Sequence, residues 1–293
     1  MSDPDALPHP SPRYRKIRRL GAGGYGVVWL ARDDRLGRDV AIKYVHTLGE
    51  EEAARFRREA QLAARIRHPN VVQIYEVGRT HLVMQYVEGV QAGETELSFR
   101  QAADVVRQAA EGVGGAHALG IVHRDLKPAN IVLSGNRAVV MDFGLARSAE
   151  GAGTTMSGTI LGTPAYMSPE QASGRLRQID ARSDVYSLGA TLYHLLAGRP
   201  PFVGDSPLHV IQLSLAETPP APSTFRSGID PDLEGIVARA MAKDPAARYA
   251  GGSELARDLA RWLAGGKPRL RRPTRPSRPP LPLRKRPGLV APA

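Results

Sequence analysis

The first third of the chain alternates apolar and polar residues over short stretches. The alternation runs from Tyr14 to Leu20, resumes after a glycine-rich stretch up to Ala31, and returns over 39–45. Two further runs, 71–77 and 81–87, flank Gly78-Arg79-Thr80. A period of two predicts strands with one buried face, and short glycine-containing connections predict hairpins. We therefore predict an antiparallel sheet here.

Other stretches place apolar residues three and four positions apart, which predicts amphipathic helices. A charged helix is predicted from Gly49 to about Arg65. A capping box at Ser98-Phe99-Arg100-Gln101 begins a helix that runs to about Leu119. Further helices are predicted from Ser183 to just before Gly198 and over 205–265, where the last helix carries Leu255, Leu259 and Trp262. The second part of the chain is therefore mainly helical.

The chemistry concentrates between Ile121 and Gly144, where apolar strand-like pieces alternate with polar turns. Asp125 can accept a proton, and Lys127 can hold an anionic oxygen. Asn130 and Asp142 carry hard oxygen ligands of the kind that Mg²⁺ prefers. An acceptor, a cation and two metal ligands in one short region suit the transfer of a phosphoryl group, where catalysis is mostly positioning and charge neutralisation.

Two features earlier in the chain fit a phosphate site. The glycine-rich stretch 21–26 is followed by a strand and by no βαβ unit, which separates it from a dinucleotide-binding fingerprint. Its backbone amides can cover phosphates without a Cβ in the way. Lys43 lies in the next strand, where it is either a phosphate-binding cation or a surface lysine whose stem covers apolar residues.

Taken together, His123-Arg124-Asp125 through Asn130, Asp142-Phe143-Gly144 and the glycine stretch resemble the eukaryotic-type protein kinases. Within that family the chain resembles the bacterial Hanks-type serine/threonine kinases. The resemblance implies an α+β, bilobal protein-kinase fold, with a small antiparallel β-sheet lobe that holds one helix and a larger, mainly α-helical lobe. It covers a kinase domain over 14–264, with the N-lobe about 14–84, the hinge about 85–89 and the C-lobe about 90–264.

The resemblance implies transfer of the γ-phosphoryl group of ATP to protein Ser or Thr hydroxyls, with Mg²⁺ as cofactor and Mn²⁺ as a substitute. Asp125 would orient and deprotonate the acceptor, and Lys43 would hold the α- and β-phosphates. The expected catalytic residues are Lys43, Asp125, Lys127 and Asn130, and the expected metal ligands are Asn130 and Asp142. The residues expected to form the ATP site are Leu20, Gly21, Ala22, Gly23, Gly24, Tyr25, Gly26, Val28, Ala41, Lys43, Glu59, Gln85, Val87, Val132 and Asp142.

Several supporting roles follow from the same resemblance. Glu59 would orient Lys43, Asp184 would hold the backbone near His123, and Glu170 would pair with Arg248. Lys127 and Thr163 favour serine/threonine over tyrosine acceptors. The residues expected to stack behind the active loop are Ala63, Ile74, His123 and Phe143. The chain departs from the family pattern at two places. Ser168 replaces the alanine that usually precedes Pro169-Glu170, and the segment 89–96 after the hinge is shortened and interrupted by glycines.

Composition narrows the function classes. The 293 residues are 42% hydrophobic and 24% charged, which is typical of a soluble globular protein. The chain has no cysteine, so a disulfide framework and a thiol nucleophile are excluded. No apolar run approaches the ~18 residues of a membrane span, and the acidic start of the chain is unlike a signal peptide. We expect a cytoplasmic protein, with attachment to a membrane surface as the alternative.

The basic character of the chain lies at its end. The net charge is +11, but 267–293 hold nine Lys or Arg and no acid, and removing those nine charges leaves +2. With eight prolines as well, 265–293 are expected to be a disordered tail, as are residues 1–13. The tail could dock on an acidic protein partner or on anionic lipid, or serve only as a linker. It has no aromatic residue, which disfavours sequence-specific nucleic-acid binding.

Two alternatives to an active kinase remain at this stage. One is a pseudokinase, which the presence of Lys43, Glu59, Asp125, Asn130 and Asp142 weakens. The other is a polyanion binder that acts through the basic tail. For an active kinase, we expect switching by autophosphorylation, because a phosphate on the loop after Gly144 would match the arginine at position 124. The expected sites are Thr155 and Thr154 first, then Ser157 and Thr159.

Overall fold

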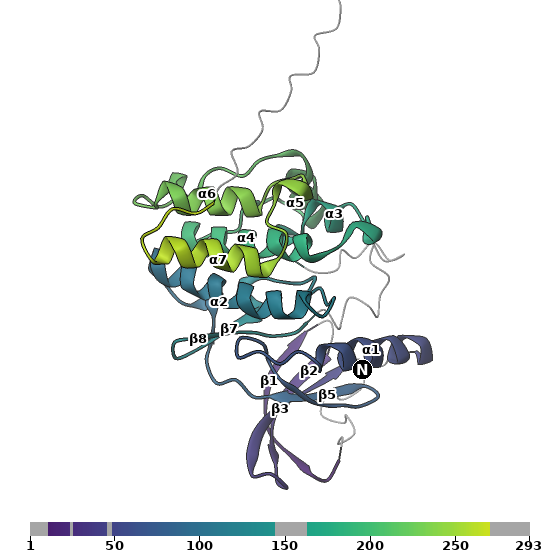
Figure 1. The fold of residues 1–293 in the computed structure, drawn as a ribbon. Coiled ribbons are helices and arrows are strands. Elements are labelled where there is room, and N and C mark those ends of the chain that lie inside the picture. The colour runs from purple at the N-terminus through teal and green to yellow at the C-terminus, as the bar shows by residue number, and fades with distance from the viewer. Residues whose placement is uncertain (1–10, 24–25, 46–48, 144–162, 270–293) are drawn as a thin grey trace, which may run out of the picture.

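The computed structural model describes residues 11–23, 26–45, 49–143 and 163–269. These form two lobes, which Figure 1 shows one above the other. The lower lobe holds a five-stranded sheet and helix α1, and the upper lobe holds the other helices. The predicted α+β fold with a small antiparallel lobe and a larger helical lobe is confirmed. Residues 1–10 and 270–293, where most of the predicted disorder falls, lie outside the described residues.

The small lobe is an antiparallel sheet with the strand order β1-β2-β3-β5-β4. Val28 of β2 pairs with Lys43 of β3, which pairs in turn with Leu82 of β5. The bounds are β1 Tyr14–Gly23, β2 Gly26–Asp33, β3 Arg38–Val45, β4 Ile74–Val77 and β5 His81–Gln85. The alternating stretches of the sequence are therefore these strands, and the register sets Lys43 at the centre of the sheet.

Helix α1, Glu50–Ala63, buries one face, and the residues that it buries are Ala53, Phe56, Ala60 and Ala63. Its first turn carries three acidic residues, which the helix dipole favours at an N-terminus. Glu59 lies one residue before the buried Ala60 and is half-buried. The burial of this face places Glu59 at the edge of the apolar contact.

A three-stranded sheet, β6-β7-β8, and an isolated bridge between Val71 and Val140 follow the small lobe. After β5 the chain forms β6, Val90–Gln91, which pairs with β7, Ile131–Ser134, and β7 pairs with β8, Arg137–Val140. The backbone of Val140 also bonds to Asn70 and Val72, so β8 is tied to the segment that precedes β4. A single 3₁₀ turn, Ala92–Glu94, follows the hinge, in agreement with the shortened segment expected there.

The large lobe is built around α4, Ala181–Ala197, which is buried along almost its whole length. Helix α2, Phe99–His117, begins with the predicted capping box, in which Ser98 accepts from the Gln101 amide and Gln101 accepts from the Ser98 amide. The remaining helices are α3 Pro169–Ala172, α5 Pro207–Ala216, α6 Pro231–Ala240 and α7 Gly252–Leu263. Figure 1 shows α2 and α7 side by side at the front of this lobe.

The glycines of α2 have a packing role. A Cβ on Gly114 would lie 2.3 Å from the Ser253 hydroxyl, and a Cβ on Gly252 would lie 2.5 Å from the Ala110 carbonyl. The backbones of α2 and α7 can approach this closely only because both residues lack a side chain. The cost of glycine in the interior of α2 is thus offset by helix packing. In the described part of the chain, none of the helices combines the length and the apolar character that crossing a membrane requires.

Candidate active site

The loop that carries Asp125 is held in place by a buried aspartate. The backbone amides of His123 and Arg124 donate to the two Asp184 carboxylate oxygens at 2.7 and 2.8 Å. The His117 ring contacts the same carboxylate, with 2.8 Å between Nε2 and Oδ2. Asp184 is fully buried at the start of α4, so these donors replace the water that it loses. The role that was predicted for Asp184 is confirmed.

This anchor holds a strained backbone. Arg124 has a φ of 68°, in the left-handed region that a side chain disfavours. Asp142 has a φ of 53° and is the other non-glycine residue with positive φ among those described. Such conformations cost of order 1–3 kcal/mol each and persist only where the surroundings hold them. Both lie in the region that the sequence assigns to chemistry, one beside Asp125 and the other at a predicted metal ligand.

His123 links the two strained segments. Its Nδ1 accepts a hydrogen bond from the Asp125 amide at 3.2 Å, and its Nε2 lies 2.8 Å from the Met141 carbonyl. A ring that accepts at Nδ1 and donates at Nε2 is the neutral tautomer with its proton on Nε2. The ring also packs on Phe143, with centroids 4.6 Å apart. Phe143 shares its buried cluster with the other two members of the expected stack, Ala63 and Ile74.

Asp125 lies among three polar side chains. Lys127 Nζ is 3.0 Å from Asp125 Oδ2 and 3.4 Å from the hydroxyl of Thr163. The Asn130 amide nitrogen donates to the Asp125 carbonyl at 2.7 Å and to its carboxylate at 3.1 Å. Asp125 is thus held from two sides and is partly exposed, so its carboxylate can meet an incoming hydroxyl. Asp125, Lys127, Asn130 and Thr163 are brought together as the sequence predicts.

Lys43 and Asp142 form an ion pair across the space between the lobes. Their Nζ and Oδ1 atoms are 2.7 Å apart, and the side chains are 12% and 36% exposed. Burial raises the pKa of Asp142, but the charge and hydrogen bond of Lys43 outweigh it and hold that pKa below its usual value. Asp142 is therefore a carboxylate at neutral pH, which a metal ligand must be.

Glu59 is the predicted residue whose expected contact differs in this structure. Within the described ranges, no ion pair joins Glu59 to Lys43, whose ammonium is engaged by Asp142. Burial raises the pKa of Glu59, and the guanidinium of Arg124 is the strongest of the charges that lower it. In this structure the charge of Arg124 in the catalytic loop acts on Glu59 of α1, while Lys43 forms its ion pair with Asp142.

The predicted adenine-site residues gather in one apolar cluster. Its buried members are Ala41, Val72, Met84 and Val139, and those packed against it are Leu20, Val28, Val87 and Met141. Val132 pairs with Val139 of this cluster through β7 and β8. Gln85 is fixed through its backbone amide, which donates to Gln73 at 2.8 Å. Four of the residues predicted to contact ATP therefore belong to one apolar cluster, namely Leu20, Val28, Ala41 and Val87.

The glycine-rich stretch forms the end of the β1–β2 hairpin. Gly21, Ala22 and Gly23 pair with Val28, Val27 and Gly26. Gly26 has a φ of 141°, and a Cβ there would lie 1.8 Å from the Tyr44 carbonyl, so only glycine fits against β3. Gly24 and Tyr25 lie outside the described residues, as do the loop positions Thr154, Thr155, Ser157 and Thr159.

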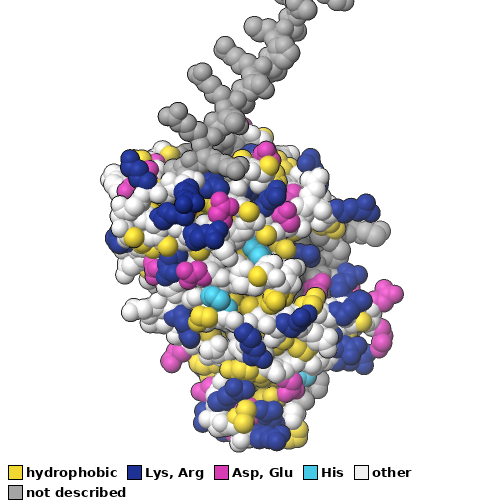
Figure 2. Space-filling view, in the orientation of Figure 1, with side chains coloured by type: hydrophobic (Ala, Val, Ile, Leu, Met, Phe, Trp, Pro, Cys, Tyr) yellow, Lys and Arg dark blue, Asp and Glu magenta, His cyan; other side chains and the backbone are white. Residues whose placement is uncertain are grey.

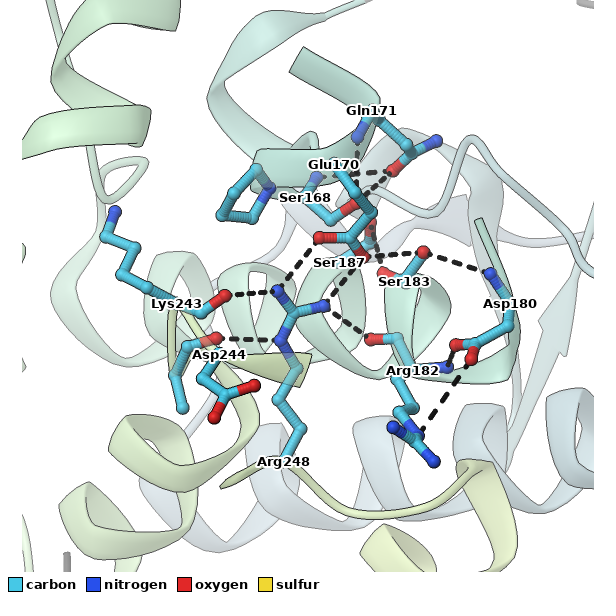
Figure 3. A network of polar contacts seen from close by, with 12 residues as sticks. Ser168, Glu170, Gln171, Asp180, Arg182, Ser183, Ser187, Lys243, Asp244 and Arg248 are labelled. Carbon is cyan, nitrogen blue, oxygen red and sulfur yellow. Dashed lines mark hydrogen bonds and ion pairs between the residues drawn. The ribbon is translucent and has the colours of Figure 1, made fainter. Parts of the chain in front are cut away.

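A buried ion pair braces the segment that follows this loop. Arg248 donates to both Glu170 carboxylate oxygens at 2.8 and 3.0 Å, as predicted. Ser183 Oγ donates to the same carboxylate at 2.6 Å, and Figure 3 shows Arg248 also reaching backbone carbonyls on either side. Burial raises the pKa of Glu170, but Arg248 and Ser183 outweigh it and bring the pKa below its usual value.

Sequence reasoning missed two positioning residues. Gln171 donates through Nε2 to the Arg124 carbonyl at 2.8 Å, which ties α3 to the catalytic loop. His117 supports Asp184 and accepts from the Gly252 amide through Nδ1. The Ser-x-x-Gln pattern at 168–171 signals the helix start that positions Gln171. No local pattern marks His117, because its partners come from α4 and α7.

The donor set fits a magnesium nucleotide. Among the described residues no group of three or more His, Cys, Asp or Glu side chains is positioned to hold a metal by itself. Mg²⁺ in phosphoryl-transfer sites typically takes one or two protein oxygens, with phosphates and water as its other ligands. The Asn130 amide nitrogen donates to Asp125, which leaves the amide oxygen available as a ligand, and Asp142 is ionised. Together these two side chains supply the oxygens that such a site requires.

Comparison with known proteins agrees with this geometry. The sequence model of the protein kinase domain matches residues 14–271. The chain belongs to the protein kinase family. Its kinase relatives include the serine/threonine-protein kinase PknB of Mycobacterium leprae, 43% identical over 279 residues, which are 89% of this chain and 44% of the relative. Another is the probable serine/threonine-protein kinase SCO3848 of Streptomyces coelicolor, also 43% identical, over 86% of this chain and 40% of that protein.

A solved kinase structure shows the same fold. The crystal structure of the Mycobacterium tuberculosis PknI kinase domain matches with a TM-score of 0.67 and 30% identity, and the match covers 87% of this chain and 96% of that one. The kinase chain described here spans less than half the length of the curated relatives given above. The similarity therefore concerns their kinase domains.

Proposed function

We propose that the chain is an ATP-dependent serine/threonine protein kinase, which transfers the γ-phosphoryl group of ATP to protein Ser or Thr hydroxyls. The observation that carries this proposal is a pair of side-chain contacts. Lys43 meets Asp142 at 2.7 Å, and Lys127 lies between Asp125 and Thr163 at 3.0 and 3.4 Å. One pair suits the nucleotide and its metal, and the other suits the acceptor hydroxyl and the charge that develops on transfer.

Each residue then has a defined task. Asp125 accepts the proton of the hydroxyl, and Asn130 holds the backbone and carboxylate of Asp125 in place. Lys127 neutralises negative charge beside the acceptor. Asp142 and the Asn130 oxygen would hold Mg²⁺, with Mn²⁺ as a substitute, and the metal supplies charge neutralisation for the phosphates. Lys43 would hold the α- and β-phosphates once the nucleotide replaces Asp142 as its main partner.

We propose that this structure represents a resting arrangement of α1. A Lys43–Glu59 pair is required in active protein kinases, and here Lys43 is paired with Asp142 instead. Ala63, at the end of α1, contributes a small side chain to the buried stack, which leaves α1 less firmly placed. A phosphate on Thr154, Thr155, Ser157 or Thr159 would compete with Glu59 for the charge of Arg124. Autophosphorylation would then favour the arrangement in which Glu59 turns to Lys43.

The remaining assignments belong to the same proposal. The kinase domain would span 14–264, and the chain would work in the cytoplasm on protein substrates. The basic tail after residue 264 would contact an acidic surface, and the absence of aromatic residues there supports a protein or lipid surface over a specific nucleic-acid sequence. These assignments rest on sequence composition and on the family resemblance.

The test is ATP turnover by the full chain and by Asp142→Asn, which is nearly isosteric and removes the charge. Loss of one charge-stabilising group typically costs about 10²–10³ in rate. We expect a loss of at least that size, whereas the exposed Asp205→Asn should retain the wild-type rate. Nucleotide binding without turnover by the wild type would make the chain a pseudokinase. Equal rates for Asp142→Asn and wild type would refute the assignment of Asp142.

A further inference from the structure

The large lobe contains a cavity lined by residues that lie far from the catalytic residues in the sequence. It encloses about 440 Å³ between α6 and the segment 218–222, and we call it the α6 pocket. Tyr193 of α4 lines it, and Val237, Ala238 and Met241 of α6 form one wall. Most of the exposed lining is apolar. A cavity of this size and character is in the range that proteins use for ligands.

The α6 pocket is preformed. Pro219, Pro220 and Pro222 form the wall opposite α6, and proline fixes its own φ, so this wall loses little freedom on binding. Glu234 of α6 accepts a hydrogen bond from the Ser223 amide at 2.7 Å, which ties the proline wall to the helix. The shape of the pocket is therefore set by its own contacts.

The entrance of the α6 pocket is acidic. Glu234 lines it, and Glu217 lies two residues before Pro219, where the proline wall begins. Asp230 and Asp232 stand at the start of α6 and are exposed or partly exposed. Among the described residues that line the pocket, Lys243 is the one cation. Its ammonium donates to the Ser214 carbonyl, and burial lowers the pKa of Lys243. An apolar group with basic neighbours would complement these charges.

The described chain ends against α6, the helix that forms one wall of this pocket. The Arg269 amide donates to Asp258 at 3.1 Å, and its carbonyl accepts from Arg239 at 2.9 Å. Arg239 belongs to α6, five residues after Glu234, and at 1.5 Å per residue the two are about 8 Å apart along the helix. The remainder of the chain thus starts from a fixed point on the helix that lines the α6 pocket.

That remainder has the complementary chemistry. Leu281 and Leu283 lie between Arg278 and the basic run that begins at Arg284. The twelve residues from Arg269 to Leu281 can span up to about 37 Å in an extended proline-rich conformation, which is more than enough to reach. On the face that Figure 2 shows, over α7 and the adjoining part of α6, basic side chains are mixed with acidic ones.

We propose that Leu281 and Leu283 of this chain dock in the α6 pocket. The two leucines would fill the apolar interior, and the flanking arginines would lie against the acidic entrance at Glu234. Because the segment is tethered at Arg269, its effective concentration at the pocket is in the mM range of short flexible linkers, so weak contacts suffice. This docking is independent of phosphotransfer and gives the basic tail an acidic partner within the same chain.

The test uses disulfide capture, since the chain has no cysteine of its own. One full-length variant carries Ala238→Cys at the rim of the α6 pocket together with Leu283→Cys. The matched control carries Ala260→Cys, an equally exposed alanine on α7 two residues from Asp258, together with Leu283→Cys. Under mild oxidation we expect the Ala238 pair to close within one molecule at least tenfold faster than the Ala260 pair.

A third variant adds Glu234→Gln to the Ala238 pair. Glutamine keeps an acceptor for the Ser223 amide and removes the charge, so closure should slow severalfold, and 1 M salt should slow the parent pair as well. Equal closure rates for the Ala238 and Ala260 pairs would overturn the proposal, since a freely moving tail reaches both. Capture at Ala238 only between two molecules would overturn it too, and would assign the pocket to a second copy.

Discussion

Replacing Arg248 with methionine removes the centre of the network in Figure 3 and keeps most of the buried alkyl stem. The guanidinium donates to both Glu170 oxygens and to the carbonyls of Ala242, Arg182 and Lys243, at 2.7–3.1 Å. The side chains of Arg248 and Glu170 are 0% and 4% exposed. In Arg248→Met, Ser183 is left as the donor to a buried carboxylate, and three carbonyls lose a partner.

The structure sets the size of the expected effect. Removing one member of a buried ion pair costs about 3–5 kcal/mol, mostly because the other charge stays buried. That is a large share of the 5–15 kcal/mol that typically separates folded from unfolded domains. For a domain of this size it corresponds to a fall of roughly 6–20 °C in Tm. The exposed pair Arg32–Asp39, with side chains 39% and 43% exposed, should contribute only about 0–1 kcal/mol.

Urea unfolding followed by tryptophan fluorescence measures this free energy. The chain has two tryptophans, so Trp29→Phe leaves Trp262 of α7 to report on the large lobe. In that background, Arg248→Met should lower the free energy of unfolding by about 3–5 kcal/mol and Arg32→Met by less than about 1. The double variant Glu170→Leu with Arg248→Met should recover part of the loss. Equal effects of Arg248→Met and Arg32→Met would refute the view that the buried pair braces the lobe.

The same pair predicts a pH dependence. The pKa of Glu170 in the folded protein lies below its ordinary 4.5, so the unfolded state binds the proton more readily. The stability from this group is therefore present above pH 4.5 and is lost as the pH falls through the folded-state value. The difference in unfolding free energy between wild type and Arg248→Met should narrow over that range. If the difference in unfolding free energy between wild type and Arg248→Met stayed constant from pH 7 to pH 3, the assignment of this stability to the ionised Glu170 would be contradicted.

Two more predictions concern the glycine-rich stretch 21–26 and the loop that follows Gly144. Gly26→Ala should destabilise the small lobe by more than about 1 kcal/mol, measured through Trp29, because its Cβ would meet the Tyr44 carbonyl at 1.8 Å. Gly21→Ala, whose Cβ would meet nothing within 4 Å, is its control, and equal losses would contradict the packing argument. Replacing the four hydroxyl residues of that loop by alanine should lower the rate at which an added substrate is phosphorylated at least about tenfold, which corresponds to ~1.4 kcal/mol in the activation barrier. Mass spectrometry should find phosphate on the loop in the wild type but not in Asp125→Asn. A loop without phosphate in a fully active wild type would remove this switch. The loop residues replaced are Thr154, Thr155, Ser157 and Thr159.

The sequence predicts the parts of this fold that depend on local pattern. Alternation located the strands, and the Ser98 capping box marked the start of α2. The family motifs also predicted long-range contacts, since Asp184 bonds the catalytic loop and Glu170 pairs with Arg248. These contacts join segments whose relative positions are set by the fold as a whole. Recognising the motifs was therefore enough to predict the contacts.

What the sequence did not predict depends on how packed elements settle against one another. A motif states which residues serve the reaction, but the position of α1 decides whether Lys43 meets Glu59 or Asp142, and here it meets Asp142. His117 and Gly114 act through partners on other helices, so nothing beside them in the chain reveals their roles. The α6 pocket likewise forms between a helix and a proline segment that have no shared pattern.

The most direct test of the central claim is the identity of the product. The full chain, Asp125→Asn and Lys43→Ala would each be incubated with γ-labelled ATP, Mg²⁺ and a general protein substrate, and the labelled side chains would be identified after hydrolysis. We predict labelled phosphoserine or phosphothreonine with the wild type and neither above background with either variant. Wild-type labelling by Asp125→Asn, or label confined to phosphotyrosine, would contradict the claim that this site is a serine/threonine kinase.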